Sequence, residues 1–105
     1  MFAERLAACF PLAAAWGVAY PRLSVRRMRA RWGSCGASGH IILNLRLIQR
    51  RPELIDYVVI HELCHLKQFN HSNRFWQLVE KHDPTYNESV EWLKTNGVRI
   101  EGALR

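Results

Sequence analysis

The chain has 105 residues, of which 49% are hydrophobic, and its 15 Lys and Arg outnumber nine Asp and Glu to give a formal net charge of +6. This length allows one domain with a modest core. The composition, together with the lack of repeats, excludes a disordered chain and a repeat array.

The positive charge is concentrated in arginines. They form two groups along the chain: Arg22, Arg26, Arg27, Arg29 and Arg31, then Arg46, Arg50 and Arg51. Such a face attracts acidic partners, so association with nucleic acid is one hypothesis. A solvated surface that keeps a small domain in solution is the simpler one.

The three cysteines, Cys9, Cys35 and Cys64, are odd in number and form no C-x-x-C pair. This pattern argues against a disulfide framework and favours a reducing compartment. We interpret all three as small buried residues. A metal or redox role for Cys64, which lies between two candidate metal ligands, is the alternative.

The apolar stretch over residues 6–19 is too short to span a bilayer. Glu4 precedes it and Pro11 interrupts it, which is atypical of an export signal. Three apolar residues recur here at helical spacing: Phe2, Leu6 and Phe10. We therefore expect a helix packed on the domain, a cytoplasmic protein and no membrane partner.

Short strands follow this helix. Leu23 and Val25 alternate with polar neighbours, and the alternation changes phase over residues 28–32, which predicts a bulge near Arg26 or two short strands meeting there. A segment rich in Gly and Ser and then an apolar run occupy residues 33–44. These two features predict a hairpin.

A buried helix is expected from Pro52 to about Phe69. Proline followed by Glu53 is a favourable helix opening, and the residues after it are apolar almost all round. A further helix should begin after Ser72, as its N-cap, and end at residues 83–84. We expect a last helix from about Asn87 to Lys94.

Residues 61–65, His-Glu-Leu-Cys-His, form the H-E-x-x-H pattern on the buried helix. Residues four apart share one helical face, so His61 and His65 can bind one ion at roughly 2.0–2.1 Å. Glu62 would lie beside the ion and accept a proton from a water whose pKa zinc lowers toward about 7. The alternative is a chance grouping on a core helix.

His71 is the expected third ligand, provided that the helix ends before it. On an unbroken helix its side chain would point away from His65, so we place the end at Phe69 and Asn70, with Asn70 in a left-handed cap conformation. The spacing equals that of metzincins, but Gln68 replaces their glycine and no methionine follows. A carboxylate is the alternative third ligand: Glu80, Asp83 or Glu88.

Other polar residues have weaker claims to a role. His40 and His82 have no companion ligands in the sequence, and we interpret both as structural. Three residues could stabilise a developing oxyanion, and the sequence does not choose between them: Tyr57, Arg74 and Tyr86.

Four ordered motifs carry a family resemblance. They are RWGSC at 31–35, IILN at 41–44, IDYVVIHELCHL at 55–66 and NHSNRFW at 70–76. With them the chain resembles the YgjP-like metallopeptidases, which are similar to the SprT and Spartan proteases, over roughly residues 20–85. Family members are commonly longer, so we interpret the chain as a minimal form or a fragment.

The resemblance implies a gluzincin-like α+β fold, a minimal zincin-type domain. In it a small antiparallel twisted sheet packs on a central active-site helix with further helices, and residues 1–105 form one catalytic domain. It also matches His71 to the family's third histidine. A peptide substrate would lie along an exposed sheet edge and pair with the backbone of Trp32, Gly33 and Ser34. The alternative for this segment is a plain strand and turn with Trp32 in the core.

The function expected is that of a zinc metalloendopeptidase acting on extended polypeptide, with one zinc ion per chain. Two alternatives remain: a zinc hydrolase acting on a small amide, and a module associated with nucleic acid in which zinc is structural. Glu62 argues against the last, because a structural site needs no adjacent base. A Spartan-like protease acting on DNA-bound proteins would unite two of these readings.

Overall fold

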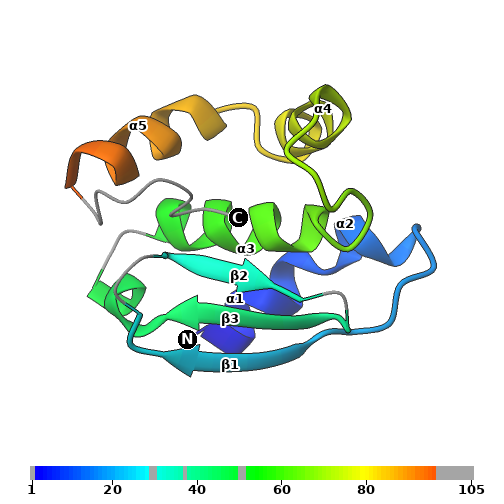
Figure 1. Ribbon diagram of the computed structural model, residues 1–105, viewed down its shortest axis with the longest axis horizontal. Helices are drawn as coiled ribbons and strands as arrows, with labels where there is room; N and C mark the ends of the chain where they lie inside the picture. The colour runs from blue at the N-terminus through cyan, green and yellow to red at the C-terminus, as the bar shows by residue number, and fades with distance from the viewer. Residues whose placement is uncertain (1, 29–30, 37, 50–51, 97–105) are drawn as a thin grey trace.

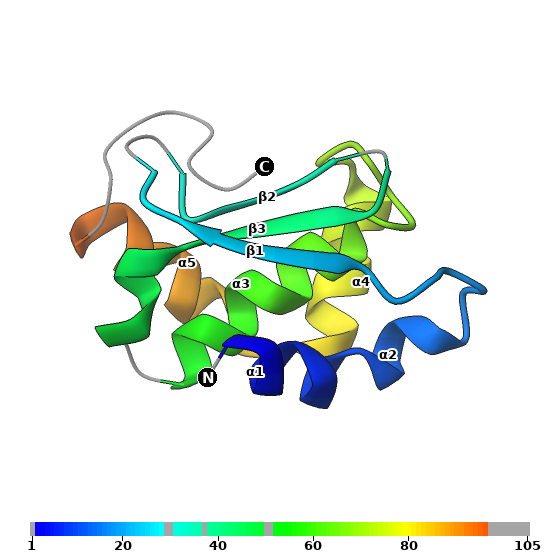
Figure 2. The same cartoon turned by 90° about the horizontal axis from the view of Figure 1, so that it is seen from below.

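The computed structural model describes residues 2–28, 31–36, 38–49 and 52–96. Its elements in chain order are α1 (Phe2–Cys9), α2 (Pro11–Ala14), β1 (Arg22–Arg26), β2 (Gly33–Cys35), β3 (His40–Asn44), the 3-10 helix η1 (Leu45–Gln49), α3 (Pro52–Cys64), α4 (Asn73–His82) and α5 (Tyr86–Asn96). Figure 2 shows the sheet as one layer with these helices gathered on one of its faces. The predicted α+β class is confirmed.

The sheet has the strand order β1-β3-β2 (Figure 1). β2 and β3 form the expected antiparallel hairpin, but β1 pairs with β3 in parallel, so the prediction of an antiparallel sheet is wrong for this pair. The three strands alternate in direction along the chain. β3 is the most apolar of them and takes the centre, where Ile41 and Leu43 are fully buried, and this order makes β1 and β3 run the same way.

The segment between β1 and β2 is held by a buried side chain. Asn44 Nδ2 donates to the carbonyl oxygens of Met28 at 2.9 Å and Arg31 at 2.7 Å, and its backbone N–H donates to the carbonyl of Trp32 at 2.9 Å. β1 ends at Arg26 and the next strand begins only at Gly33. The alternation over 28–32 is therefore not a strand at the residues described there, 28, 31 and 32, and residues 29–30 lie outside the described residues.

Helix α3 is the centre of the core. Ten of its 13 residues are buried, and it contacts α1, α4, α5, β2, β3 and η1. The expected N-terminal helix is present as α1, whose Phe2 and Leu6 are buried. Arg5 of α1 donates to both carboxylate oxygens of Asp56 of α3, at 2.6 and 2.7 Å, which fixes α1 along the central helix.

The end of α3 differs from the prediction. The helix ends at Cys64, not near Phe69, because the chain tightens into i→i+3 turns: His65 N–H donates to the Glu62 carbonyl at 3.1 Å, and Lys67 N–H to the Cys64 carbonyl at 3.1 Å. The left-handed conformation expected for Asn70 is also wrong, since every described residue with positive φ is a glycine. The tight turns reverse the chain without it.

The last two helices agree with the prediction. Ser72 is the N-cap of α4, and its Oγ accepts from the N–H of Phe75 at 3.4 Å. Asp83 caps the other end, and α5 occupies the region predicted to hold the final helix. In the described part of the chain, no helix has both the length and the apolar character needed to cross a membrane.

Candidate metal centre

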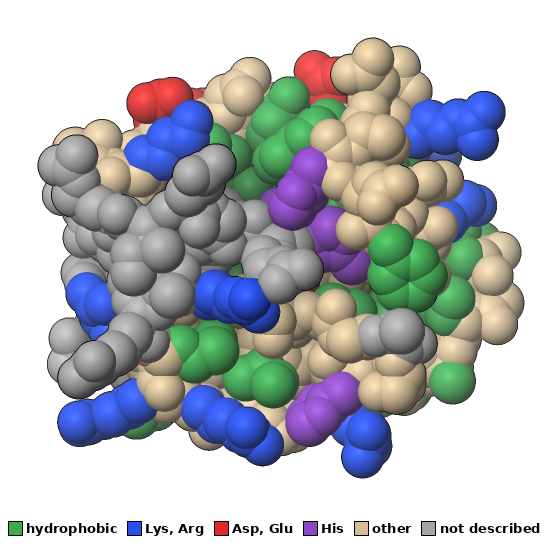
Figure 3. All heavy atoms as spheres, viewed as in Figure 1, with side chains coloured by type: hydrophobic (Ala, Val, Ile, Leu, Met, Phe, Trp, Pro, Cys, Tyr) green, Lys and Arg blue, Asp and Glu red, His purple; other side chains and the backbone are tan. Residues whose placement is uncertain are grey.

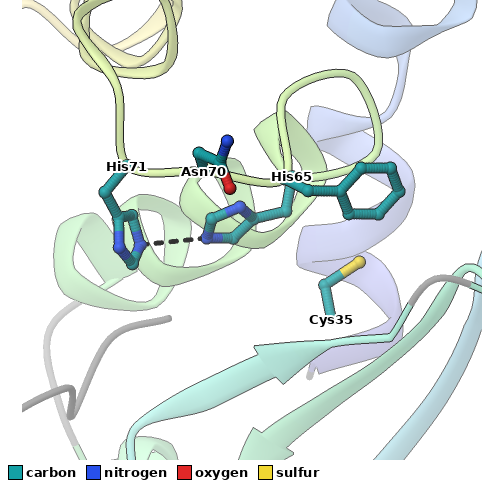
Figure 4. A pocket seen from close by; sticks show the side chains of 5 residues that line it. Cys35, His65, Asn70 and His71 are labelled. Carbon is teal, nitrogen blue, oxygen red and sulfur yellow. Dashed lines mark hydrogen bonds between the residues drawn. The ribbon is translucent and has the colours of Figure 1, made fainter.

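Three imidazoles converge where α3 ends. His61 is fully buried in the last turn of α3, His65 follows the helix with 4% of its surface exposed, and His71 lies in the exposed turn before α4. The Nε2 atom of His71 lies 3.1 Å from that of His65 (Figure 4) and 3.3 Å from that of His61. Tetrahedral zinc with bonds of 2.0–2.1 Å separates its ligands by roughly 3.3 Å, so the donor set fits a metal of this kind.

The other ring nitrogens fix the orientation of two of these rings. His65 Nδ1 lies 3.0 Å from the carbonyl oxygen of Gln68, which can only accept, so Nδ1 carries the proton and Nε2 presents its lone pair. His61 Nδ1 lies 3.2 Å from the hydroxyl of Tyr57, one helical turn earlier. Such outer partners orient metal-binding histidines.

Tyr57 is therefore placed behind a ligand. Its side chain is fully buried, and burial, reinforced by the charge of Glu62, raises the pKa of Tyr57 well above its ordinary value, so the phenol stays neutral. Its hydroxyl contacts His61 Nδ1, on the far side of that ring from the converging Nε2 atoms. Of the three suggested oxyanion donors, Tyr57 is thus the one whose hydroxyl contacts a candidate metal ligand.

Aromatic rings of α4 pack against the three histidine rings. The Phe75 ring stacks on His65 with centroids 4.4 Å apart and meets His61 edge to face at 4.9 Å. Trp76 stacks on His71 at 5.9 Å, and Tyr86 stacks on Trp76 at 5.6 Å. The sequence motif that contains Phe75 and Trp76 supported the family resemblance, but their packing on the imidazoles was not foreseen.

Glu62 is the charged residue closest in sequence to the histidines. Its side chain is fully buried, on the side of α3 that faces β2, where Gly33 passes over it. Among the described residues, the group able to hold a metal consists of the three histidines, without Glu62. Glu62 thus follows His61 directly in the sequence but lies outside the donor set.

The remaining candidate ligands lie outside that group. Glu80, Asp83 and Glu88, the alternative third ligands, do not join the three histidines, and neither do the cysteines of the described chain. Burial and the charge of Glu62 raise the pKa of Cys35 and of Cys64 to about 12, so both thiols are protonated at neutral pH. Cys64 is fully buried, which agrees with its interpretation as a small core residue, whereas Cys9 and Cys35 are only partly buried, so the same interpretation is wrong for them.

A pocket of about 280 Å³ opens beside the imidazoles. It is lined by Cys35 from β2 and by residues of the turn after α3: His65, Phe69, Asn70 and His71 (Figure 4). Histidine side chains reach the surface between the sheet and the α4–α5 layer in Figure 3. A molecule in this pocket would therefore be in contact with two of the three donor residues.

The segment predicted to bind substrate lies next to this pocket. β2 is an edge strand of the described sheet, since its neighbour there is β3 alone. Gly33 and Ser34 lie on it, whereas the side chain of Trp32 is fully buried and its carbonyl accepts from Asn44. The core interpretation of the Trp32 side chain therefore agrees with the structure.

The two other histidines are separate from the donor group. His40 lies at the start of β3, with Nε2 2.7 Å from the hydroxyl of Ser24. His82 ends α4 and packs edge to face on Trp16, and burial, with the nearby charge of Lys81, lowers its pKa. Both positions agree with a structural role.

Three convergent imidazoles, two of them lining an open pocket, are typical of metal-dependent hydrolases. The model of the YgjP-like metallopeptidase domain matches residues 2–96. The chain belongs to the YgjP-like family and is a metallopeptidase. This membership disfavours both the small-amide hydrolase and the module with a structural metal.

Solved structures agree on the fold. The chain is similar to the metallopeptidase zymogen abylysin of Pyrococcus abyssi, with a TM-score of 0.79 and 25% identity over 90% of this chain and 93% of that chain. Jannalysin of Methanocaldococcus jannaschii, also crystallised as a zymogen, gives a TM-score of 0.76 and 16% identity over 90% of this chain and 95% of that one. No curated protein matches the chain.

Proposed function

We propose that the chain is a zinc endopeptidase in which His61, His65 and His71 hold one Zn²⁺ ion. The observation that carries this proposal is the spacing of their Nε2 atoms, 3.1 and 3.3 Å for the two pairs that include His71. Three neutral imidazoles with an open fourth side are a common catalytic zinc site, whereas structural zinc usually has four protein ligands.

Glu62 is proposed as the general base. Bound zinc would polarise the scissile carbonyl and lower the pKa of a water molecule. The Glu62 carboxylate takes one proton from the attacking water, whose oxygen bonds to the carbonyl carbon, and delivers that proton to the nitrogen of the breaking C–N bond. Full burial of the side chain keeps this transfer away from bulk solvent.

The substrate is proposed to be an extended polypeptide paired with β2. An edge strand offers unpaired N–H and C=O groups to a peptide, and the β2 edge away from β3 is open in the described sheet. We assign this contact to the backbone of Trp32, Gly33 and Ser34. Trp32 and Gly36 bond to β3, and alternate residues of a strand point their backbone groups to the same side, so Ser34, which pairs with Ile42, also faces β3. Of the three residues, Gly33 is therefore the one whose N–H and C=O face the open edge.

Glu62→Gln tests this assignment. The amide keeps the shape of the carboxylate but cannot take the proton, so we expect turnover of a quenched-fluorescence peptide to fall about 10²–10⁴-fold while one zinc ion per chain remains. Glu80→Gln, which changes an exposed carboxylate of α4, is the matched control. Unchanged turnover in Glu62→Gln with zinc retained would refute the mechanism.

We also propose an association with nucleic acid through the arginine-rich side. Residues 5–52 contain nine Arg and no Asp or Glu, and Lys and Arg side chains gather over the sheet in Figure 3. Arg22, Arg26 and Arg27 are exposed, whereas Arg29, Arg50 and Arg51 lie outside the described residues. DNA affinity should fall steeply with salt. Absence of binding at low salt would contradict this role.

We propose, finally, that residues 1–105 form one catalytic domain that acts in the cytoplasm. The support is the state of the thiols, since all three cysteines are free. Free thiols are typical of a reducing compartment. Fractionation of cells that express the chain would test the location.

A further inference from the structure

We infer that Gly33 is a positioning residue for catalysis: its missing side chain makes the space that seats the Glu62 carboxylate beside the three imidazoles. This inference rests on the proposed role of Glu62 as general base. It assigns to Gly33 a function apart from backbone pairing with substrate.

The contact between β2 and α3 carries the inference. Gly33 is buried and pairs with Leu43 of β3. A Cβ atom at Gly33 would lie 3.0 Å from Val58 Cγ1, 3.1 Å from Glu62 Oε2 and 3.3 Å from Glu62 Cγ. Val58 and Glu62 are four residues apart, so one face of α3 supplies both neighbours. The β2 backbone thus lies directly against the face that carries the base.

The backbone conformation does not explain the glycine. Positive φ occurs at Gly17 and Gly39, so Gly33 lies in the strand conformation that any residue can adopt. Gly39 and Gly17, by contrast, are required by their conformation. At Gly33 the requirement is close approach of the strand to the helix.

A methyl group at Gly33 would displace the neighbouring side chain that can move most easily, which is that of Glu62. The strand is fixed by its pairing with β3 and by the bond from Asn44 to the Trp32 carbonyl, and Val58 is fully buried in the core. The end of the Glu62 side chain has the most rotational freedom of these groups. The displacement therefore falls on the carboxylate proposed to take the proton, and misplacement of a reacting group by about 1 Å can cost about 10²-fold in rate.

Gly33→Ala and Gly36→Ala form a matched pair. Gly36 follows β2 directly, its φ is not positive, and among the described residues a Cβ there would come within 4 Å of Ser38 Oγ alone, at 3.9 Å. We expect Gly33→Ala to bind one zinc ion, to lower kcat about 10- to 100-fold and to leave KM within about 3-fold. Gly36→Ala should match the parent chain. A rise in KM with unchanged kcat would overturn the inference and leave only a substrate contact.

A double-mutant cycle on the metal-free chain tests the contact between Gly33 and Glu62 by stability and does not depend on enzyme activity. Glu62→Ala removes both Cγ and Oε2, so Gly33→Ala should lower the unfolding temperature less in that background than in the parent. Equal shifts in the two backgrounds would contradict a direct contact. Should Gly33→Ala fail to fold, Val58→Ala removes the nearest methyl group and leaves the contact with Oε2, and both comparisons are then made in that background.

Failure of the proposed function and failure of the inference about Gly33 give different experimental results. Full turnover in Glu62→Gln would defeat the proposed function, and this inference with it. Loss of turnover in Glu62→Gln, together with equal kcat in Gly33→Ala and Gly36→Ala, would defeat the positioning role of Gly33 alone.

Discussion

The end of α3 and the segment from His71 to Trp76 supply the same kind of ligand in different ways. His61 and His65 are enclosed by the core, and each has a polar partner for its Nδ1 atom. His71 is exposed, and its ring is backed by the stacked Trp76. Folding therefore orients two of the donors before any metal arrives, whereas the third depends on a surface turn.

This difference separates stability from metal affinity. A buried ligand contributes to the core as well as to the metal, so its replacement should affect both. An exposed ligand contributes mainly to the metal. Variants at the two places should therefore lose zinc to a similar extent. Only the variant at the buried ligand should also lose stability in the metal-free chain.

The largest effect is expected for His61→Ala compared with His71→Ala. Both variants lose one of three imidazoles, so both should fail to retain zinc through dialysis against a weak chelator. Only His61→Ala should destabilise the metal-free chain, by about 2–4 kcal/mol, because it leaves a cavity in the core. Denaturant unfolding of the metal-free variants measures this. Equal loss of stability in both would break the comparison.

Tyr57→Phe removes the polar partner of the buried ligand His61. Without the hydroxyl, His61 Nδ1 loses this hydrogen-bond partner and the ring orientation is less well fixed, so zinc affinity should fall about 10- to 100-fold. Competition with a fluorescent chelator measures the change. Tyr20→Phe, which removes an exposed hydroxyl, is the control. Affinity equal to that of the control would show that Tyr57 does not support His61.

Trp76→Leu removes the ring that stacks on the exposed ligand His71, and its effect on zinc affinity should be the smallest of the three. It removes the ring stacked on His71 but keeps an apolar side chain, and such ring pairs are worth about 0.5–1.5 kcal/mol. Zinc affinity should fall about 2- to 12-fold, by conversion of that energy. Trp16→Leu, whose ring contacts His82 and Lys67 instead, is the control. A loss as large as that of His71→Ala would show that the exposed turn depends wholly on this stack.

Local signals in the sequence predicted much of the fold. The buried helix, the Ser72 cap, the hairpin and the N-terminal helix each depend on neighbouring residues, so spacing and capping rules are sufficient for them. The parallel pairing of β1 with β3 was missed because strand order depends on contacts between distant segments. The early end of α3 was missed because i→i+3 turns need neither glycine nor proline.

The site was predictable in part for the same reason. The H-E-x-x-H spacing predicted His61, Glu62 and His65 on one helix; His61 and Glu62 lie on α3, whereas His65 lies in the turn directly after it. Their ligand and base roles remain predictions. Tyr57 lies one turn before His61, so its support could have been read from that spacing. The close contact between Gly33 and Glu62 could not have been predicted in this way. It forms between a strand and a helix whose contacting residues, 33 and 62, are 29 positions apart in the sequence.

Three imidazoles that meet at one zinc ion can be recognised by X-ray absorption at the zinc edge of the zinc-loaded chain. The spectrum should show three histidine nitrogens at roughly 2.0–2.1 Å and one oxygen ligand from solvent, with no sulfur. A sulfur shell near roughly 2.3 Å, which Cys35 or Cys64 would have to supply, or fewer than three imidazoles, would contradict this coordination.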